Sequence, residues 1–339
     1  MSLSSIKITN EAGEVVNAQA PVIISASRST DIPAFYADWF IERWQKGYVK
    51  WKNPFNGTYL YVSFQNTRAI VFWSKNPNPM FKHIDFLNER IKNYYFQYSL
   101  NDYEKEGYEG MVPKLQTRID IFKKLSDRIG KEKVIWRFDP LMITQDIDVN
   151  ELLERVNKIG DQLKNYTCKF VFSFADIANY KKVESNLKKE KIPYKEFTPD
   201  DMIAFAKGLQ RLNESWGLEI GTCAENAPLE EYGIIHNKCI DDDLFIKLFN
   251  NDKKLMDFLG VEIVEPDLFN PQKRIIKKKQ LKDKGQRALC GCMISKDIGQ
   301  YNTCPHECIY CYANTSIDIA KSNFEKFRAN TNSETITGE

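Results

Sequence analysis

The sequence predicts an α/β fold, namely a parallel (β/α) barrel, full or partial and TIM-like, with a cysteine-rich loop towards the C-terminus. Three observations predict it. Short apolar runs alternate with helix-length amphipathic stretches over the first three quarters of the chain, a pattern typical of βαβ units in a parallel sheet. The runs are nearly continuous in Val, Ile and Phe, as in strands buried on both faces. Roughly six to eight such units favour a barrel over an open dinucleotide-binding sheet, and no GxGxxG follows the first run.

The strands and helices that we expect follow one another along the chain. The strands are 21–27, 68–74, 94–99, 133–138, 168–174 and 218–223, with a weaker one at 261–264. The helices are 34–46, 80–92, 114–129, 149–163, 199–212 and 243–259. Asp31 before Ile-Pro, and Thr198 before Pro-Asp-Asp, supply the cap and the proline that a first helical turn favours.

We expect a single structural unit with two parts. The barrel occupies 1–285, and a cysteine-rich segment at 286–339 binds a metal cluster and packs on the mouth of the barrel. The last residues, 328–339, are polar, and we expect them to fray.

Composition excludes several classes of protein. Of the 339 residues, 42% are hydrophobic and 13% aromatic, which is ample material for a core and excludes a disordered or fibrous chain. The 48 Lys and Arg against 46 Asp and Glu give a formal charge of +2, which does not predict a general polyanion binder. No apolar run approaches ~20 residues, so we expect no membrane span. The start lacks the charged and apolar regions of a secretory signal, and we therefore expect a cytoplasmic protein.

Polar side chains follow the expected strands at the point where each strand ends. In a parallel barrel these loops share one end, where such folds place their chemistry. We expect catalytic roles for Arg28, Asp31, Arg137 and Asp139, and cofactor binding by Lys75, Asn76 and Glu225. Cations at strand ends suit an anionic substrate group or a cofactor carboxylate. The alternative is that these loop residues merely cap helices.

The eight cysteines are unevenly spread, because five lie within 290–311 and none lies in the first 167 residues. In a reducing compartment, clustered cysteines are more often metal ligands or catalytic groups than disulfides. Cys304, Cys308 and Cys311 read C-x3-C-x2-C. Three thiolates at that spacing bind three corners of a 4Fe–4S cluster and leave the fourth iron without a protein ligand. Zinc is the alternative, although structural zinc prefers four ligands with paired C-x2-C spacing.

The string from Tyr301 to Ala313, with Tyr310 directly before the last motif cysteine, resembles the signature of the radical S-adenosylmethionine (SAM) superfamily. It is most similar to the branch of spore photoproduct lyase and DNA repair photolyase. The whole chain also resembles a bacterial family known only as a domain of unknown function, through Ile24–Pro33, Phe72–Pro77 and the cysteine string.

The superfamily resemblance implies an oxygen-sensitive enzyme. It implies that the free iron binds the amino and carboxylate groups of SAM, and that reduction cleaves SAM to a 5′-deoxyadenosyl radical that takes hydrogen from a substrate. It implies Cys304, Cys308 and Cys311 as cluster ligands and Tyr310 as an aromatic neighbour of the adenine.

The position of the cysteine loop departs from the superfamily pattern. In most members the loop follows the first strand, whereas here it follows at least six strand–helix units. Either the barrel is circularly permuted, with 287–294 supplying the strand before the loop, or the loop folds back over the mouth of a complete barrel. The Gly-Gly-Glu element that contacts the SAM amino group in the superfamily is not apparent.

Four other cysteines are candidates for a second metal centre, namely Cys223, Cys239, Cys290 and Cys292. Together they offer a complete four-thiolate set for an auxiliary iron–sulfur cluster or a zinc ion. The alternative is that Cys223 and Cys239 are ordinary thiols. We expect Cys168, in an apolar run, to be a small buried hydrophobe, and His306 to tune the cluster sulfurs by hydrogen bonding.

The sequence therefore predicts a radical SAM enzyme. We expect a small-molecule substrate rather than a nucleic acid, and a low-potential electron donor such as flavodoxin or ferredoxin. The basic run at 273–287 is either a solvated helix face or a cationic rim for such a partner. Two other functions stay open: a barrel stapled by zinc or an inert cluster that acts as a binding module, and nucleic-acid lesion repair or modification by radical chemistry.

Overall fold

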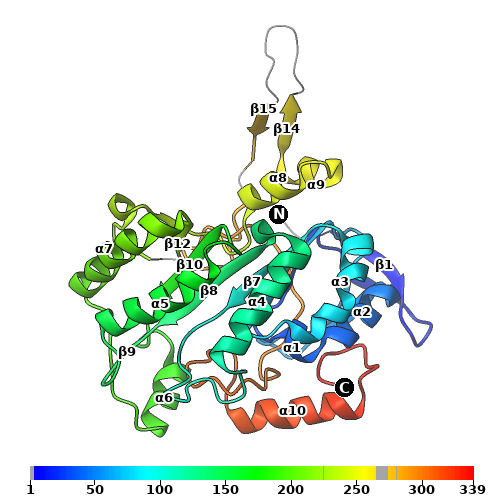
Figure 1. Ribbon diagram of the computed structural model, residues 1–339. Helices are drawn as coiled ribbons and strands as arrows, with labels where there is room; N and C mark the ends of the chain where they lie inside the picture. The colour runs from blue at the N-terminus through cyan, green and yellow to red at the C-terminus, as the bar shows by residue number, and fades with distance from the viewer. Residues whose placement is uncertain (1–3, 224, 265–273, 280) are drawn as a thin grey trace.

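The computed structural model describes residues 4–223, 225–264, 274–279 and 281–339. Its largest element is an eight-stranded sheet in which every pair of neighbours is parallel (Figure 1). In spatial order the strands are β13 (Ile234–His236), β12 (Glu219–Thr222), β10 (Lys169–Phe174), β8 (Val134–Leu141), β7 (Tyr94–Ser99), β6 (Ala69–Ser74), β3 (Ile23–Ala26) and β16 (Lys296–Asp297). The predicted α/β class with a parallel sheet is confirmed.

The prediction of a full or partial TIM-like barrel is not confirmed, and the described residues form no closed barrel. Within the described residues, β13 pairs only with β12 and β16 pairs only with β3, so the sheet has two free edges. The segment predicted as a seventh barrel strand, 261–264, forms β14 (Val261–Val264), which pairs antiparallel with β15 (Arg274–Lys277). That hairpin projects from the body of the molecule in Figure 1. Residues 274–277, part of the basic run at 273–287, therefore form a strand and not a helix face. Residues 273 and 280 of the run lie outside the described residues.

The six strong predicted strands form because both faces of the sheet are buried. On one face Phe72 and Trp136 belong to a large apolar cluster that includes the covering helices. On the other face Val71 and Ile135 belong to a second cluster, together with side chains from 239–261 and 281–293. Side chains alternate between the faces of a strand, so two apolar faces require a continuous apolar run.

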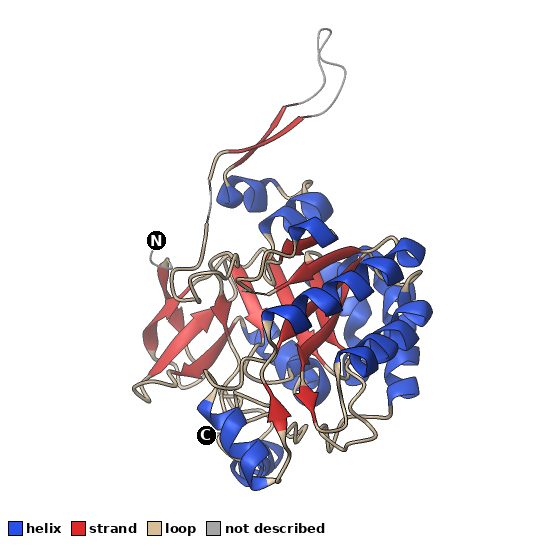
Figure 2. Ribbon diagram, turned by 90° about the vertical axis from the view of Figure 1, so that its left-hand side faces the viewer, coloured by secondary structure: helices blue, strands red, loops and turns tan. Residues whose placement is uncertain are grey.

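Helices cover the sheet (Figure 2), and α4, α5 and α7, which Figure 1 labels, pack on the face of Phe72 and Trp136. The helices of the main body are α1 (Ile32–Phe35), α2 (Ala37–Lys46), α3 (Ile84–Phe86), α4 (Leu115–Ile129), α5 (Val149–Leu163), α6 (Lys181–Lys189), α7 (Pro199–Trp216), α8 (Asp242–Phe249) and α9 (Lys253–Leu259). The two predicted first turns are present: Asp31 Oδ1 accepts from Ala34 N at 3.0 Å, and Thr198 forms a capping box with Asp201. The helix expected at 243–259 is divided because Asp252 caps a new helix.

A second sheet, which the sequence analysis missed, lies beside the first. Its order is β1 (Ser5–Thr9), β2 (Val15–Gln19), β5 (Tyr59–Ser63) and β4 (Tyr48–Lys52). The C-terminal segment after α10 (Ile317–Ala329) packs against this region: Lys50 N donates to Glu334 O at 2.9 Å, and Trp39 Nε1 donates to Ser333 O at 2.9 Å. The expectation of a frayed tail is wrong, because Thr335 is 1% exposed.

The strand β16 sets the position of the cysteine loop. It lies parallel to β3, with Lys296 opposite Ile24 and Asp297 opposite Ser25. The Asp297 carboxylate fixes this pairing, because it accepts hydrogen bonds from Ser25 Oγ at 2.8 Å and Ser27 Oγ at 2.6 Å. A strand does precede the loop, as the permuted arrangement requires, but it is Lys296–Asp297 and not 287–294. None of the helices in the described ranges is long and apolar enough to cross a membrane.

Candidate functional site

The cysteine loop, residues 298–314, lies across the carboxyl ends of the sheet strands. Met111 N, in the segment after β7, donates to His306 O at 3.0 Å, and Tyr36 OH, beyond β3, donates to Thr303 O. Asn186 Nδ2, on the helix after β10, donates to Ile309 O at 3.1 Å. The loop is thus held by segments that follow three different strands, at the end of the sheet where parallel folds place their chemistry.

The loop carries three thiols, which we call the loop thiols: Cys304, Cys308 and Cys311. Cys308 is 8% exposed, and the other two are half-buried. Burial raises the pKa of each of them, and at Cys308 the nearby Lys75 opposes the effect. Deprotonating a buried thiol is costly, and a bound metal group offsets that cost because metals bind thiolates. Three sulfurs in one short loop fit the donor set of a cluster with one open iron.

Asp31 connects the cysteine loop to the ends of β3 and β6. One carboxylate oxygen caps α1, while the other accepts from Lys75 N at 2.7 Å and lies 2.7 Å from His306 Nε2. The His306 ring is 2% exposed and packs edge-on against Phe35, with 4.6 Å between ring centroids. The Nε2 atom of His306 is therefore occupied by the Asp31 carboxylate. Its Nδ1 has no hydrogen-bond partner in the part of the chain that the structure describes.

Tyr310 belongs to a buried charged network. Its hydroxyl donates to the Glu109 carboxylate and accepts from Lys75 Nζ at 2.9 Å and Asn101 Nδ2 at 2.8 Å. Glu109 also pairs with Lys75 at 2.7 Å and Arg118 at 3.1 Å. These two cations hold the pKa of Glu109 below its ordinary value although burial alone would raise it. The Tyr310 side chain thus anchors the loop, and its stacking on an adenine stays a prediction.

The other four candidate cysteines lie in the apolar cluster on the sheet face that carries Val71 and Ile135, and we call them the inner thiol group: Cys223, Cys239, Cys290 and Cys292. Cys223 Sγ lies 3.2 Å from Cys239 Sγ, and Cys239 N donates to Cys292 Sγ at 3.3 Å. A hydrogen bond from Cys292 lowers the pKa of Cys290 to about 7. The contacts thus run from one thiol to the next. Cys168 is separate from both groups and half-buried at the start of β10.

Both predicted catalytic arginines, Arg28 and Arg137, lie beside the inner thiol group. Arg137 Nη1 donates to Cys239 Sγ at 3.2 Å and Nη2 to Cys223 Sγ at 3.6 Å. Nη2 also pairs with Asp139. The guanidinium carbons of Arg28 and Arg137 lie 5.3 and 5.2 Å from the centroid of the Trp73 ring, within the range of a cation–π interaction. Nη2 of Arg28 is buried without a hydrogen-bond partner among the described residues.

Two predicted cofactor residues make only local contacts. Asn76 Oδ1 accepts from Asn78 N at 3.4 Å, at the start of the 3-10 helix η1 (Asn78–His83). Glu225 Oε1 accepts from Asn226 N at 2.8 Å. Both are local side-chain-to-backbone contacts and neither is a helix cap, so the capping alternative does not account for these two residues and a role in cofactor binding stays a prediction.

The sequence analysis missed Glu109, Arg118, Trp73 and Asp297. The alternation of side chains along a strand could have identified Trp73. It stands two residues after Val71, on the same face of the sheet, just as Arg137 stands two residues after Ile135. Glu109 lies in a loop, where periodicity says nothing about burial.

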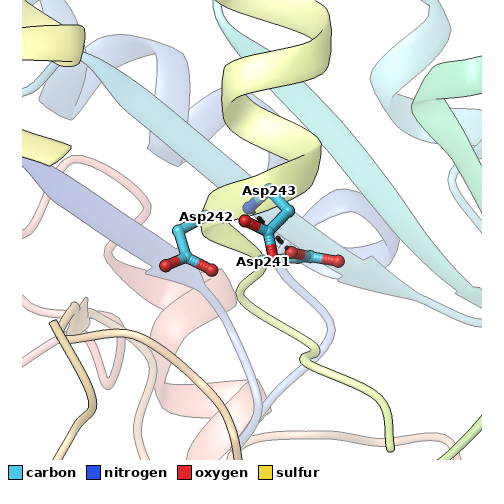
Figure 3. A group of neighbouring side chains, drawn as sticks. All are labelled: Asp241, Asp242 and Asp243. Atoms are coloured by element: carbon cyan, nitrogen blue, oxygen red, sulfur yellow. Dashed lines mark hydrogen bonds between the residues drawn. The ribbon is translucent and has the colours of Figure 1, made fainter. Parts of the chain in front are cut away.

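A group of three carboxylates, Asp241, Asp242 and Asp243, also lies close together, with one oxygen of each within 4.8 Å of the others (Figure 3). Asp241 caps α8 by accepting from Asp243 N at 2.9 Å. Asp242 and Asp243 both pair with Lys238 and Lys277. Their charges are thus already matched by lysines, and the group is explained as the start of a helix.

Comparison with known proteins gives one family match. Residues 23–313 match the model of a family described as "Domain of unknown function (DUF1848)". The match begins at the first residue of β3 and ends just after the last loop thiol. No curated protein matches the chain. A solved structure from Bacteroides thetaiotaomicron, provisionally described as an alpha-L-fucosidase, aligns with a TM-score of 0.23 and 13% identity over 57% of this chain and 74% of that chain, a likeness too weak to carry an argument.

Proposed function

This chain belongs to the DUF1848 family, and we propose that it is a radical SAM enzyme that acts on a small anionic molecule. The observation that carries the proposal is the setting of the loop thiols. They have C-x3-C-x2-C spacing and directly follow an edge strand of a parallel sheet, at the carboxyl ends of its strands.

The number of sulfur donors supports a 4Fe–4S cluster with one open iron. The loop supplies three thiols. A filled structural zinc site needs four protein ligands, whereas a cluster held by three thiolates keeps one position for a ligand. When bound, the cluster would supply the electron that cleaves SAM. An external low-potential donor such as flavodoxin or ferredoxin would then return an electron to the cluster.

The chain's own residues hold the loop and supply charge. Asp31 and Glu109 orient it from the sheet side. The Nη2 atom of Arg28 is buried and has no hydrogen-bond partner among the described residues. It can therefore donate to an anionic group, and a guanidinium fork suits a carboxylate of SAM or of the substrate. The Trp73 ring beside it offers an apolar wall. These features favour a small anionic substrate over a polymer.

The test is a SAM cleavage assay. The full chain is reconstituted anaerobically with iron and sulfide, reduced with dithionite and given SAM, and 5′-deoxyadenosine is quantified by chromatography. We expect product from the wild type and from Cys168→Ala, because Cys168 lies outside both thiol groups. We expect at least a 100-fold loss in Cys304→Ala, Cys308→Ala and Cys311→Ala. Undiminished product in these three variants overturns the proposal, as does stoichiometric zinc in the loop of a chain that never cleaves SAM.

A further inference from the structure

The proposed function leaves the inner thiol group unused, although its position in the fold is distinctive. Cys223 and Cys239 follow β12 and β13, at one free edge of the main sheet, while Cys290 and Cys292 precede β16, which forms the other edge. Met293 N donates to Ile240 O at 3.1 Å, next to the contact of Cys239 with Cys292. The thiols therefore join the two edges where a closed barrel would have paired strands.

The surroundings of these sulfurs supply hydrogen-bond donors. Asn237 Nδ2 donates to Cys223 Sγ at 3.2 Å and Cys239 Sγ at 3.4 Å, in addition to the two bonds from Arg137. A neutral thiol sulfur is a weak acceptor, so a buried guanidinium and an amide aimed at the same two sulfurs are placed to stabilise the thiolates that a bound metal requires. Such donors to ligand atoms are the usual outer shell of a metal site.

From these contacts we propose that the inner thiol group binds one zinc ion, which closes the gap between the two edges of the sheet. Four thiolates and Zn²⁺ carry a net charge of −2, which the guanidinium of Arg137 partly offsets, since it donates to two of the sulfurs and also pairs with Asp139. On binding, each thiol gives its proton to solvent and forms one sulfur–zinc bond, with no change of oxidation state.

One sulfur–sulfur distance suits a single ion better than a cubane cluster. Zinc–sulfur bonds of ~2.3 Å in a tetrahedron place neighbouring sulfurs about 3.8 Å apart, and Cys223 Sγ and Cys239 Sγ lie 3.2 Å apart. A cubane spreads its ligands much farther, because each thiolate binds a different iron. The four thiols are linked as a chain and do not surround a common point among the described residues, so zinc binding requires their side chains to turn towards one another.

The experiment measures zinc in the full-length chain, stripped with a chelator and then incubated with one equivalent of Zn²⁺. Zinc per chain is determined by elemental analysis, and its ligands by X-ray absorption. We expect about one zinc with four sulfur neighbours at ~2.3 Å in the wild type, in Cys168→Ser, and in a triple variant that replaces all three loop thiols by alanine. We expect at least a 100-fold lower zinc affinity in Cys239→Ser and in Cys290→Ser.

The outcomes are distinct from those of the SAM assay, because the triple variant lacks the proposed cluster and still binds zinc. Should Cys239→Ser fail to fold, the wild-type absorption spectrum and the partly buried Cys290→Ser decide the matter. Zinc with nitrogen or oxygen neighbours overturns the proposal. So does iron held by the inner thiol group after reconstitution, or a disulfide between Cys223 and Cys239 in protein prepared under reducing conditions.

Discussion

Arg137 and Cys239, 102 positions apart in sequence, are joined by a buried hydrogen bond of 3.2 Å from Nη1 to Sγ. The same guanidinium pairs with Asp139, whose pKa it keeps below the ordinary value despite burial. A single side chain thus links the carboxyl end of β8 to the inner thiol group.

Replacing Arg137 by Gln removes the guanidinium that donates to two sulfurs of the proposed zinc site. We expect the affinity for zinc to fall about 10- to 100-fold, the usual effect of losing an outer-shell partner, as measured by competition with a coloured chelator. The matched control is Arg155→Gln, which removes a buried arginine paired with Glu106 in another part of the fold. Equal zinc affinity in the two variants contradicts the role given to Arg137.

Replacing Glu109 by Gln leaves Lys75 and Arg118 buried without their shared counter-charge. We expect a loss of about 3–5 kcal/mol in the free energy of unfolding, because removing one partner of a buried ion pair leaves the other charge buried without compensation. Urea unfolding at pH 7 measures it. A loss below about 1 kcal/mol contradicts the network as described.

The pH dependence of the free energy of unfolding, compared between the wild type and Glu109→Gln, provides a second test of this network. The pKa of Glu109 is lowered from its ordinary 4.5, so the unfolded chain binds more protons than the folded one just below that pH. The stability that this carboxylate contributes is present above pH 4.5 and is lost as the pH falls through the folded pKa. We expect the wild type to lose stability faster than Glu109→Gln on acidification from pH 5. Parallel curves are the contrary result.

Gly299 lies where the cysteine loop leaves β16 and has no room for a side chain. A Cβ there would lie 1.9 Å from Ser27 Oγ and 2.5 Å from Ser27 Cβ, so Gly299→Ala forces the loop away from β3. We expect it to destabilise the chain by about 1–3 kcal/mol and to halve, at least, the iron taken up on reconstitution. The control is Gly160→Ala, whose Cβ would lie 2.3 Å from the Trp216 ring between helices; we expect similar destabilisation with normal iron content. Iron uptake unchanged in both variants counts against the docking of the loop.

Asp31 receives both Lys75 N and His306 Nε2 on one carboxylate oxygen. The other oxygen accepts from Ala34 N, so in Asn either Ala34 N or both of the other groups face an amide nitrogen, at a cost of about 1–3 kcal/mol. We expect Asp31→Asn to lower 5′-deoxyadenosine formed per bound cluster at least 10-fold. Asp252→Asn also alters a helix-capping aspartate, one paired with Arg68, and we expect it to leave that ratio unchanged. A normal ratio in Asp31→Asn refutes its positioning role.

The sequence predicted the parallel strands because burial on both faces leaves a continuous apolar run, as in 94–99 and 168–174. It did not predict β16, since Lys296 and Asp297 have no apolar signal and their pairing depends on Asp297 reaching Ser25 and Ser27. Whether the sheet closes into a full barrel or stays open could not be predicted, because an apolar run reports burial and not which strand lies next to it. The gap between the edges is covered by the segment at 290–293, which forms no strand with its neighbours.

For the candidate site, residue type and spacing identified the two thiol groups and the strand-end residues Arg28, Asp31, Lys75 and Arg137. The partners Glu109 and Arg118 come from a loop and from a helix. Their burial depends on tertiary contacts, which no local pattern encodes.

The most direct test is the electron paramagnetic resonance spectrum of the reconstituted, dithionite-reduced chain before and after SAM is added. We predict the signal of one reduced 4Fe–4S cluster, absent in Cys308→Ala and present in Cys168→Ala, whose shape and g-values change when SAM binds the open iron. A cluster spectrum that SAM leaves unaltered, or a signal that persists without Cys308, contradicts the assignment of the loop thiols.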